Sequence, residues 1–244
     1  MNADAPTLDA VLAALAGVGL TPRGAFHPAP GDGVPALADG RPARTLVLAG
    51  NAGPGLWRRF AAERDPARDS LDAWTRAVLE PVARRLGAAA LYPFTAPPLP
   101  FQRWARNAEP CHASPLGLLI HPEWGLWHGY RGALAFADTL ALPPRPAPEP
   151  SPCDSCETRP CLDACPVAAF SPDGFDWPAC TRHLVRPEGA DCMDLGCRAR
   201  RACPVGAEHR HAPAQAAFHM RAALAGATAA AAASPDPDRA GPET

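Results

Sequence analysis

Apolar residues recur at helical spacing in two segments of the N-terminal part of the chain. Residues 8–15 carry leucine and valine at positions i, i+3, i+4 and i+7, which predicts a short amphipathic helix. Residues 71–86 repeat the pattern, with Ser70 placed to cap the start and Gly87 to end it. Pro81 falls inside this second helix and is expected to kink it.

Continuous apolar runs elsewhere in this part predict short, buried strands. Residues 45–49 form one such run, followed by a glycine-rich turn, and residues 88–92 form another. Residues 115–136 contain two further β-like runs, separated by residues 121–125. The alternation of strand and helix runs predicts an α/β domain, of the α+β kind, over residues 1–142.

The C-terminal part is organised differently. Residues 143–152 are dense in proline, which predicts an extended, semi-rigid linker. Residues 153–225 hold most of the cysteines but few large apolar side chains, so we expect bound metal to supply much of the folding free energy of a small, mainly helical domain. A closing helix is expected over residues 212–225. The composition of residues 226–244 favours a disordered tail.

Charge and hydropathy exclude several kinds of partner. The 244 residues carry a formal net charge of −2, so no sequence-wide attraction to nucleic acid or to an anionic membrane is expected. The acidic N-terminus lacks the basic segment of a signal peptide, and no apolar run is long enough to span a bilayer. We therefore expect a cytoplasmic protein, in a reducing compartment that suits thiolate ligands.

Eight of the nine cysteines lie within residues 153–203. The first four are spaced C-x2-C-x4-C-x3-C-P, Cys180 stands alone, and a second run again ends in Cys-Pro. Each iron of a cubane cluster needs a soft, charged sulfur donor, and two [4Fe–4S] clusters require eight of them. The expected metal ligands are Cys153, Cys156, Cys161, Cys165, Cys180, Cys192, Cys197 and Cys203.

Three other interpretations of these cysteines stay open. Structural zinc uses four-cysteine sites, although zinc pairs are normally C-x2-C twice and Cys-Pro is unusual after them. Disulfides need an oxidising compartment, and no export signal is visible. Free thiols in an ordinary core would not cluster so closely in sequence. The spacing favours iron–sulfur clusters over zinc, and zinc over the other two.

The cysteine region resembles the two-cluster module of epoxyqueuosine reductase and related corrinoid-dependent reductases. In those enzymes an isolated cysteine before a short helix lies between two runs that each end in Cys-Pro, and Cys180 occupies that place here. The resemblance implies a ferredoxin-type domain with a different ligand set for each cluster. These sets are Cys153, Cys156, Cys161 and Cys203 for one cluster, and Cys165, Cys180, Cys192 and Cys197 for the other.

A second resemblance lies in the sequence IHPEWGLWHGYRGAL, which is similar to a signature of the cobalamin-processing decyanase family. That family has a nitroreductase-like fold, and the likeness implies a corrinoid beside His121, Trp127 and Arg131. The alternative interpretation is a packed β-hairpin in which Arg131 pairs with a carboxylate such as that of Glu123. Arginine and aromatic side chains at the mouth of a pocket serve either role.

Smaller features also have two interpretations. Arg198, Arg200 and Arg201 lie between two expected ligands, where they either offset the charge of a cluster or form a solvated face. Because cysteine already supplies every expected ligand, capping or packing is predicted for the three histidines that follow. Cys111 is expected to be a buried thiol. The three histidines are His209, His211 and His219.

Together these features predict a ferredoxin-like electron-transfer protein. Two [4Fe–4S] clusters would relay single electrons to a redox partner protein, or to a cofactor held by residues 1–142. One rival is an oxidoreductase that uses the clusters to reduce cobalt in a bound cobalamin or other corrinoid. The other rival is a zinc-stabilised interaction module without redox chemistry.

Overall fold

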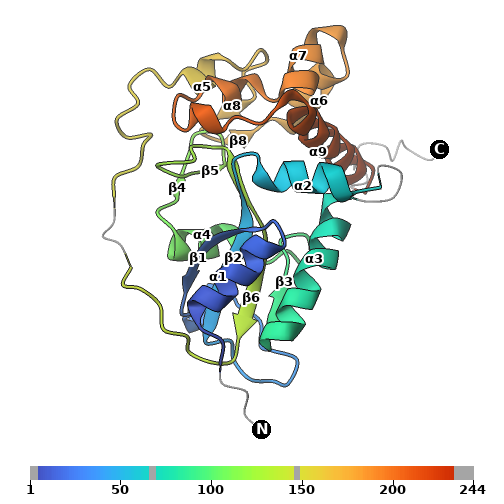
Figure 1. The fold of residues 1–244 in the computed structure, drawn as a ribbon. Coiled ribbons are helices and arrows are strands. Elements are labelled where there is room, and N and C mark those ends of the chain that lie inside the picture. The colour runs from blue at the N-terminus through green and yellow to red at the C-terminus, as the bar shows by residue number, and fades with distance from the viewer. Residues whose placement is uncertain (1–4, 66–69, 146–148, 234–244) are drawn as a thin grey trace, which may run out of the picture.

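A computed structural model describes residues 5–65, 70–145 and 149–233, and a four-stranded sheet lies at the centre of its N-terminal part (Figure 1). The strand order is β1-β2-β6-β3, and every neighbouring pair is antiparallel. The fold is therefore of the α+β class, as the sequence predicts. The four strands are β1 (Thr21–Phe26), β2 (Thr45–Ala52), β3 (Ala89–Leu91) and β6 (His128–Phe136).

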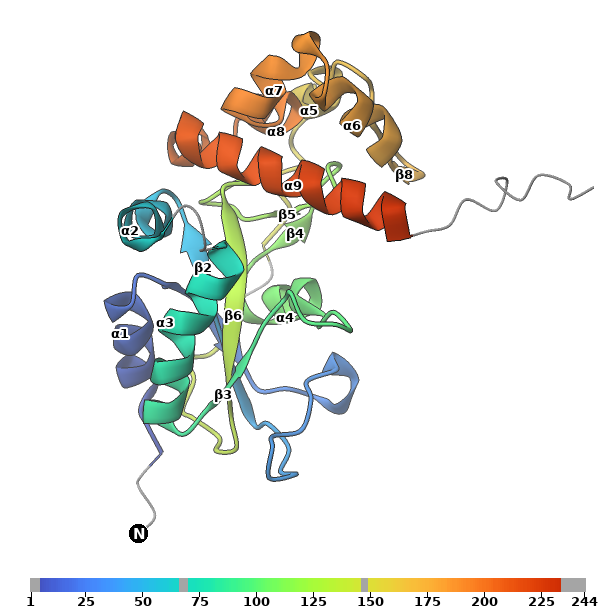
Figure 2. The ribbon, with the colours of Figure 1, turned by 90° about the vertical axis from the view of Figure 1, so that its right-hand side faces the viewer.

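Helices cover both faces of the sheet, because alternate residues of β2 and β6 point to opposite sides. Val47 and Leu134 pack on the face covered by α1 (Leu8–Gly17) and α3 (Leu71–Leu86). Leu46, one residue away, packs on the face covered by α4 (Phe101–Ala108). Figure 2 shows α1 and α3 on one side of the sheet and α4 on the other. Both faces of the sheet are thus buried, which explains the continuous apolar runs within β2 and β6.

The two predicted N-terminal helices form with the expected ends. Ser70 accepts a hydrogen bond from the Ala73 N–H at 3.1 Å, and Gly87 ends α3 in the left-handed region with a φ of 68°. Thr7 caps α1 in the same way through the Ala10 N–H. Pro81 lies inside α3, and the helix continues past it to Leu86.

One element that escapes sequence-based prediction is the edge strand β1. The strand β1 contains Pro22 and Gly24, both uncommon inside strands. It forms because it is an edge strand, where a missing N–H is tolerated, and its pairing with β2 shifts register between Pro22 and Ala25. A Cβ at Gly24 would lie 2.4 Å from the Ala108 carbonyl oxygen, so glycine lets the end of α4 pack against the strand.

The packed β-hairpin of the alternative interpretation does not form from the two β-like runs around residues 121–125. The first run forms β5 (Leu119–Ile120), which pairs with β4 (His112–Ala113) in a separate two-stranded sheet. The second run forms β6 of the main sheet. Only an isolated bridge between His121 and Gly125 closes the turn that separates them.

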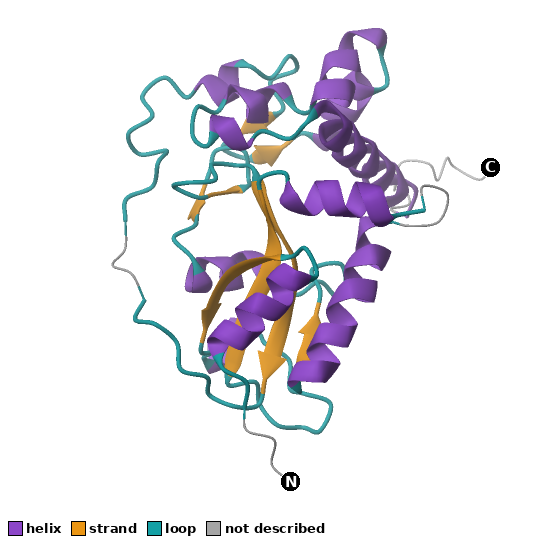
Figure 3. Cartoon of the chain, viewed as in Figure 1, coloured by secondary structure: helices purple, strands orange, loops and turns teal. Residues whose placement is uncertain are grey.

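The cysteine region forms short helices joined by turns, which lie beyond one end of the sheet (Figures 1 and 3). A long helix, α9 (Pro213–Ala233), lies between these short helices and α2 (Gly55–Glu63). The ring of Phe218 in α9 packs against that of Trp57 in α2, with the ring centroids 5.2 Å apart. The remaining elements are α5 (Pro160–Asp163), β7 (Phe170–Ser171), β8 (Gly174–Phe175), α6 (Trp177–Leu184), α7 (Ala190–Leu195), α8 (Arg198–Ala202), and 3-10 turns at Pro30–Asp32, Pro187–Gly189 and Ala207–His209.

The last helix extends further than predicted. It continues to Ala233, past the expected end at residue 225, because the alanine-rich run has high helix propensity and Gly226 alone does not interrupt it. The predicted disordered tail, residues 226–244, is therefore wrong over residues 226–233, which are helical. Residues 234–244 of that tail lie outside the described residues, as do residues 146–148 of the predicted linker. Among the described helices, none has the length and apolar character that crossing a bilayer requires.

Candidate metal centre and adjoining cavity

The structure gathers the eight clustered cysteines into two groups, each of which lines a small cavity of its own. Residues far apart in sequence meet in both groups. The memberships coincide with the two ligand sets implied by the resemblance to epoxyqueuosine reductase. The first group is Cys153, Cys156, Cys161 and Cys203, and the second is Cys165, Cys180, Cys192 and Cys197.

Cys203 crosses from the second sequence run to the first cavity. The thiols of Cys153 and Cys161 both interact electrostatically with that of Cys203. In the second group, Cys180 interacts in the same way with Cys197 and with the other two members. Each cavity is therefore closed by a cysteine distant in sequence, and the two groups interlock.

Backbone N–H groups face the sulfurs at several of these positions. The Ala169 N–H donates to Cys165 Sγ at 3.3 Å, and the N–H groups of Ala199 and Arg200 face Cys197. Ala168 directs the first of these bonds by adopting a left-handed conformation, with a φ of 47° that is uncommon for a residue with a Cβ. Hydrogen bonds to sulfur stabilise a thiolate, so these loops are built to hold negative charge.

Without metal, however, burial favours the protonated thiols. Desolvation raises the pKa of Cys180 to about 11, and neighbouring thiols add to the shift. Burial likewise raises the pKa values of Cys153, Cys197 and Cys203. Metal binding to either group must therefore release protons, and its affinity must increase with pH.

Among the described residues, which include all nine cysteines, no three His, Cys, Asp or Glu side chains come close enough together to hold one ion. A zinc ion needs four sulfurs at about 2.3 Å from one point. Four cysteines around a cavity instead suit a larger inorganic group with one iron behind each sulfur.

The two parts of the chain meet directly beside the first cavity. Ile120 and Pro115 of the N-terminal part line this cavity together with the cysteines. The backbone at Gly125 also passes so close to the segment after Cys203 that a Cβ at Gly125 would lie 1.9 Å from the Val205 carbonyl oxygen. Only glycine permits this crossing, and Trp124 stacks on His209 across it at 4.4 Å.

The three arginines between the cysteines have different surroundings. Arg198 and Arg201 both pair with Asp191, and the side chain of Arg198 is 51 % exposed. Arg200 points away from them, donates a hydrogen bond to the Leu126 carbonyl oxygen at 3.1 Å, and lies 4.6 Å above the ring of Trp127.

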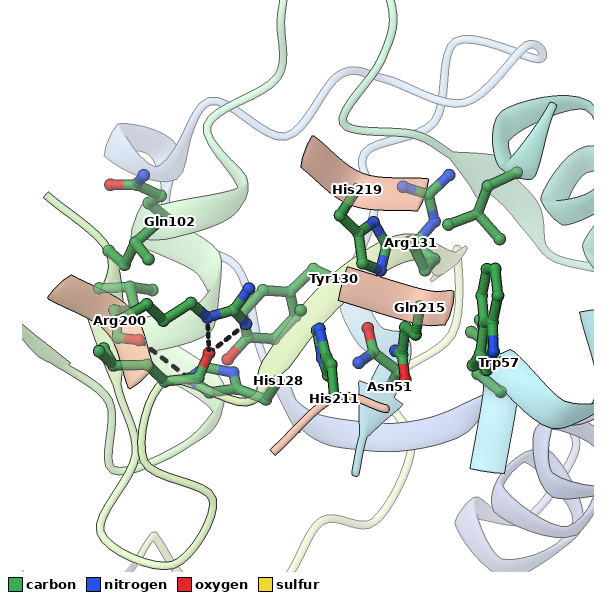
Figure 4. A pocket seen from close by; sticks show the side chains of 16 residues that line it. Asn51, Trp57, Gln102, His128, Tyr130, Arg131, Arg200, His211, Gln215 and His219 are labelled. Atoms are coloured by element: carbon green, nitrogen blue, oxygen red, sulfur yellow. Dashed lines mark hydrogen bonds between the residues drawn. The ribbon is translucent and has the colours of Figure 1, made fainter. Parts of the chain in front are cut away.

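A larger cavity of about 340 Å³ lies where β2, β6, α8 and α9 meet (Figure 4). Of the three residues expected beside a corrinoid, only Arg131 lines it. Arg131 pairs with Asp72 and not with Glu123, and it also donates to Thr75 Oγ1 at 3.3 Å. Trp127 is 3 % exposed and packs beneath Arg200.

His121 turns into its own loop. Its Nδ1 accepts hydrogen bonds from the N–H groups of Glu123 and Trp124, at 3.1 and 3.3 Å. Burial lowers the pKa of His121, so the ring is suited to this acceptor role in its neutral form. Its observed contacts are thus those of a residue that shapes the turn.

Sequence reasoning missed three polar side chains that line this cavity. His211, Gln215 and His219 recur at every fourth position, and Figure 4 shows them opposite Asn51 and Tyr130 of the sheet. Packing was predicted for the two histidines, and they do contact each other, with ring centroids 5.2 Å apart. His211 lies just before α9, and the four-residue spacing that continues to Gln215 and His219 in this alanine-rich helix is the signal that indicates a polar face.

The ninth cysteine lies apart from the other eight. Cys111 is buried as predicted, and its Sγ lies 3.2 Å from the Tyr130 hydroxyl. That hydroxyl donates to Glu109 Oε2 at 2.8 Å, and Arg23 pairs with the same carboxylate. Burial raises the pKa of the Cys111 thiol, so it stays protonated at neutral pH.

The chain is similar to epoxyqueuosine reductase from Bacillus subtilis, with 15% sequence identity and a TM-score of 0.45. The likeness covers 72% of this chain and 53% of that chain, so the present chain spans about half the length of that enzyme. No family model and no curated protein matches the chain.

Proposed function

We propose that this chain is an iron–sulfur redox protein that holds two [4Fe–4S] clusters and transfers single electrons. The observation that carries the proposal is the pair of cavities lined by four cysteines each. The first cluster would be held by Cys153, Cys156, Cys161 and Cys203, and the second by Cys165, Cys180, Cys192 and Cys197.

When bound, the clusters supply one-electron chemistry, and the chain's own residues set the conditions for it. Backbone N–H groups facing Cys165 and Cys197 stabilise negative charge on sulfur. Phe170, Phe175 and Met220 line the second cavity and keep water from it. Burial and N–H···S bonds are the means by which a protein adjusts a cluster's potential.

The electrons need a donor and an acceptor, and we propose a redox partner protein for one of these roles. The second cavity lies close to the molecular surface, because Cys180 belongs to α6, whose first residue, Trp177, is 49 % exposed. Val185, directly after α6, is 70 % exposed. Exposed apolar side chains beside a buried redox centre suit a transient protein contact.

A second candidate is an enzyme in which the electrons reach a molecule bound in the 340 Å³ cavity. This candidate is favoured by α8, which carries Arg200 into the cavity and is flanked by Cys197 and Cys203, one member of each group. A corrinoid is the ligand implied by the second sequence resemblance. The cavity is at the low end of the ~300–1,000 Å³ range of drug-sized ligands, so its walls would have to move apart to admit a corrinoid.

Iron and sulfide analysis tests the main proposal. Protein purified without air and supplied with iron should contain about eight irons and eight acid-labile sulfides per chain, and give an EPR signal when reduced. A colourless protein with two zinc ions would instead establish the zinc-stabilised module. For the second candidate, hydroxocobalamin and a reductant are added, and the absence of any spectral change or measurable affinity would exclude a corrinoid ligand.

A further inference from the structure

The cavity between the sheet and α9 has a lining that is basic on one side and apolar on the other. Arg131 and Arg200 both line it, and none of the other described residues in its lining is an aspartate or a glutamate. It is separate from both cysteine-lined cavities, because no cysteine belongs to its wall. Its chemistry is therefore not explained by metal binding.

The two guanidinium groups differ in how their charge is balanced. Arg131 pairs with Asp72, whose side chain is 49 % exposed. Arg200 pairs with no carboxylate among the residues that the structure describes, and its hydrogen bonds go to the carbonyl of Leu126. Burial lowers the pKa of Arg200 to about 10, which still leaves it charged at neutral pH. A half-buried cation without a carboxylate partner attracts an anion to this wall.

Polar groups on the α9 side also lack partners. Gln215 is 1 % exposed, and its Oε1 has no hydrogen-bond partner within the described chain. The same holds for Nε2 of His211. An unsatisfied buried polar group costs about 1–3 kcal/mol, so native proteins normally pair such groups with a ligand or with water. A rotation of the Gln215 amide presents either its oxygen or its NH2 group to the cavity.

The opposite wall accepts an apolar group. Leu56, Trp57 and Leu71 line it from α2 and α3, and Leu126 and Tyr130 continue it toward Arg200. Aromatic and leucine side chains in this arrangement suit a flat, unsaturated body. The volume of about 340 Å³ fits a molecule of one or two rings.

We propose that this cavity binds a small organic anion, a carboxylate or a phosphate ester, attached to a flat apolar body. The anionic group lies against Arg200 and the unpartnered polar groups of His211 and Gln215. The flat body lies against Trp57 and the leucines. This inference goes beyond the redox proposal, because it names a ligand class for a site that contains no iron ligand.

Calorimetric titration of the full-length protein, purified without air, tests the ligand class. The probes are benzoate and phenyl phosphate, with benzamide as the neutral molecule of the same shape. We expect each anion to bind at least about tenfold more tightly than benzamide, because charge-assisted hydrogen bonds are stronger than neutral ones. Equal affinity for benzamide, or no binding of either anion at about 1 mM, would overturn the proposal.

Arginine variants locate the site. Arg200→Gln should weaken benzoate binding about tenfold, and Arg131→Gln, whose charge is already paired with Asp72, should weaken it less. Arg84→Gln, on the exposed face of α3, should not change it. Arg131 belongs to the sheet, so its variant still tests the site if Arg200→Gln fails to fold. Unchanged binding in both variants would place the anion elsewhere and end the proposal.

The iron content of the same samples separates this proposal from the redox one. Selective anion binding by a protein without acid-labile sulfide would overturn the redox proposal alone. Full iron content without a preference for the anions would overturn the ligand proposal alone.

Discussion

The sheet and the cysteine region are stabilised by different means, as their interiors show. In the N-terminal part, large side chains of the helices and of the sheet, such as Leu15, Phe60 and Leu134, are fully buried in one apolar cluster. The cysteine region has a small apolar cluster in which five cysteines take part. Its larger apolar side chains include Val185, which is 70 % exposed. Burial of apolar surface thus suffices for the first region, and we expect the second to depend on the proposed ligation.

Removal of iron should unfold the cysteine region and leave the sheet folded, which is the largest effect we expect. We expect α6, α7 and α8 to lose their amide protection when the full-length chain is depleted of iron by a chelator, while β2 and β6 keep theirs. Hydrogen exchange followed by mass spectrometry measures both regions in one sample. Slow exchange in α6 to α8 of the iron-free protein would show that this region folds by apolar burial after all.

A single cysteine substitution should separate the two cavities. Cys203→Ser is expected to reduce the iron content from about eight to about four per chain, because Cys203 belongs to the first group only. Cys111→Ser is the matched control, since Cys111 is 6 % exposed and Cys203 is 7 % exposed. The control should keep about eight irons. Loss of all iron from Cys203→Ser would mean that the two groups fold as one unit.

Sequence reasoning succeeded where local signals are strong. The ends of α3 follow from Ser70 and Gly87, because a cap is decided by neighbouring residues. The grouping of the eight cysteines could be predicted from their spacing only with the help of a resemblance. Spacing alone does not say that Cys203 joins Cys153 across fifty positions, because that contact depends on how the two runs fold back on each other.

The remaining features depend on contacts between distant segments. The strand β1 forms despite Pro22 because β2 offers it an edge, and α4 packs on it through Gly24. The cavity beside α8 is built from residues as far apart as Asn51 and His219. No window of the sequence contains that convergence, although the four-residue spacing of polar side chains in α9 marks one of its walls.

Truncation of a buried side chain in the sheet should lower the free energy of unfolding more than truncation of an exposed side chain in the cysteine region. Leu134→Ala removes a fully buried side chain from β6 and should lower the free energy of unfolding by about 2–5 kcal/mol. Val185→Ala, at an exposed position, should change it by less than about 0.5 kcal/mol. Denaturant unfolding followed by circular dichroism gives both values. The iron content of both variants should stay unchanged, and a loss of iron in Leu134→Ala would show that the regions are not independent.

The smallest expected effect concerns the contact between the two regions, where His219 faces the sheet from α9. Burial, followed by the nearby charges of Arg200 and Arg131, lowers the pKa of His219 to about 4. Below about pH 6.5 the unfolded chain binds a proton at this histidine, and the folded chain does not until about pH 4. The free energy of unfolding should therefore decrease as the pH is lowered from about 6.5 to about 4, by up to about 1.4 kcal/mol per pH unit.

Substitution of this histidine should reduce the pH dependence of unfolding that comes from the junction, and it should leave both interiors intact. Urea unfolding at pH 7 and pH 5.5 is measured for the wild type, for His219→Gln and for His27→Gln, which alters an exposed histidine at the far end of β1. Only His219→Gln should have a smaller difference between the two pH values. His211, whose pKa burial lowers to about 2, remains in the variant and should retain part of the slope. An unchanged slope in His219→Gln would mean that acid weakens the regions themselves and not the contact between them.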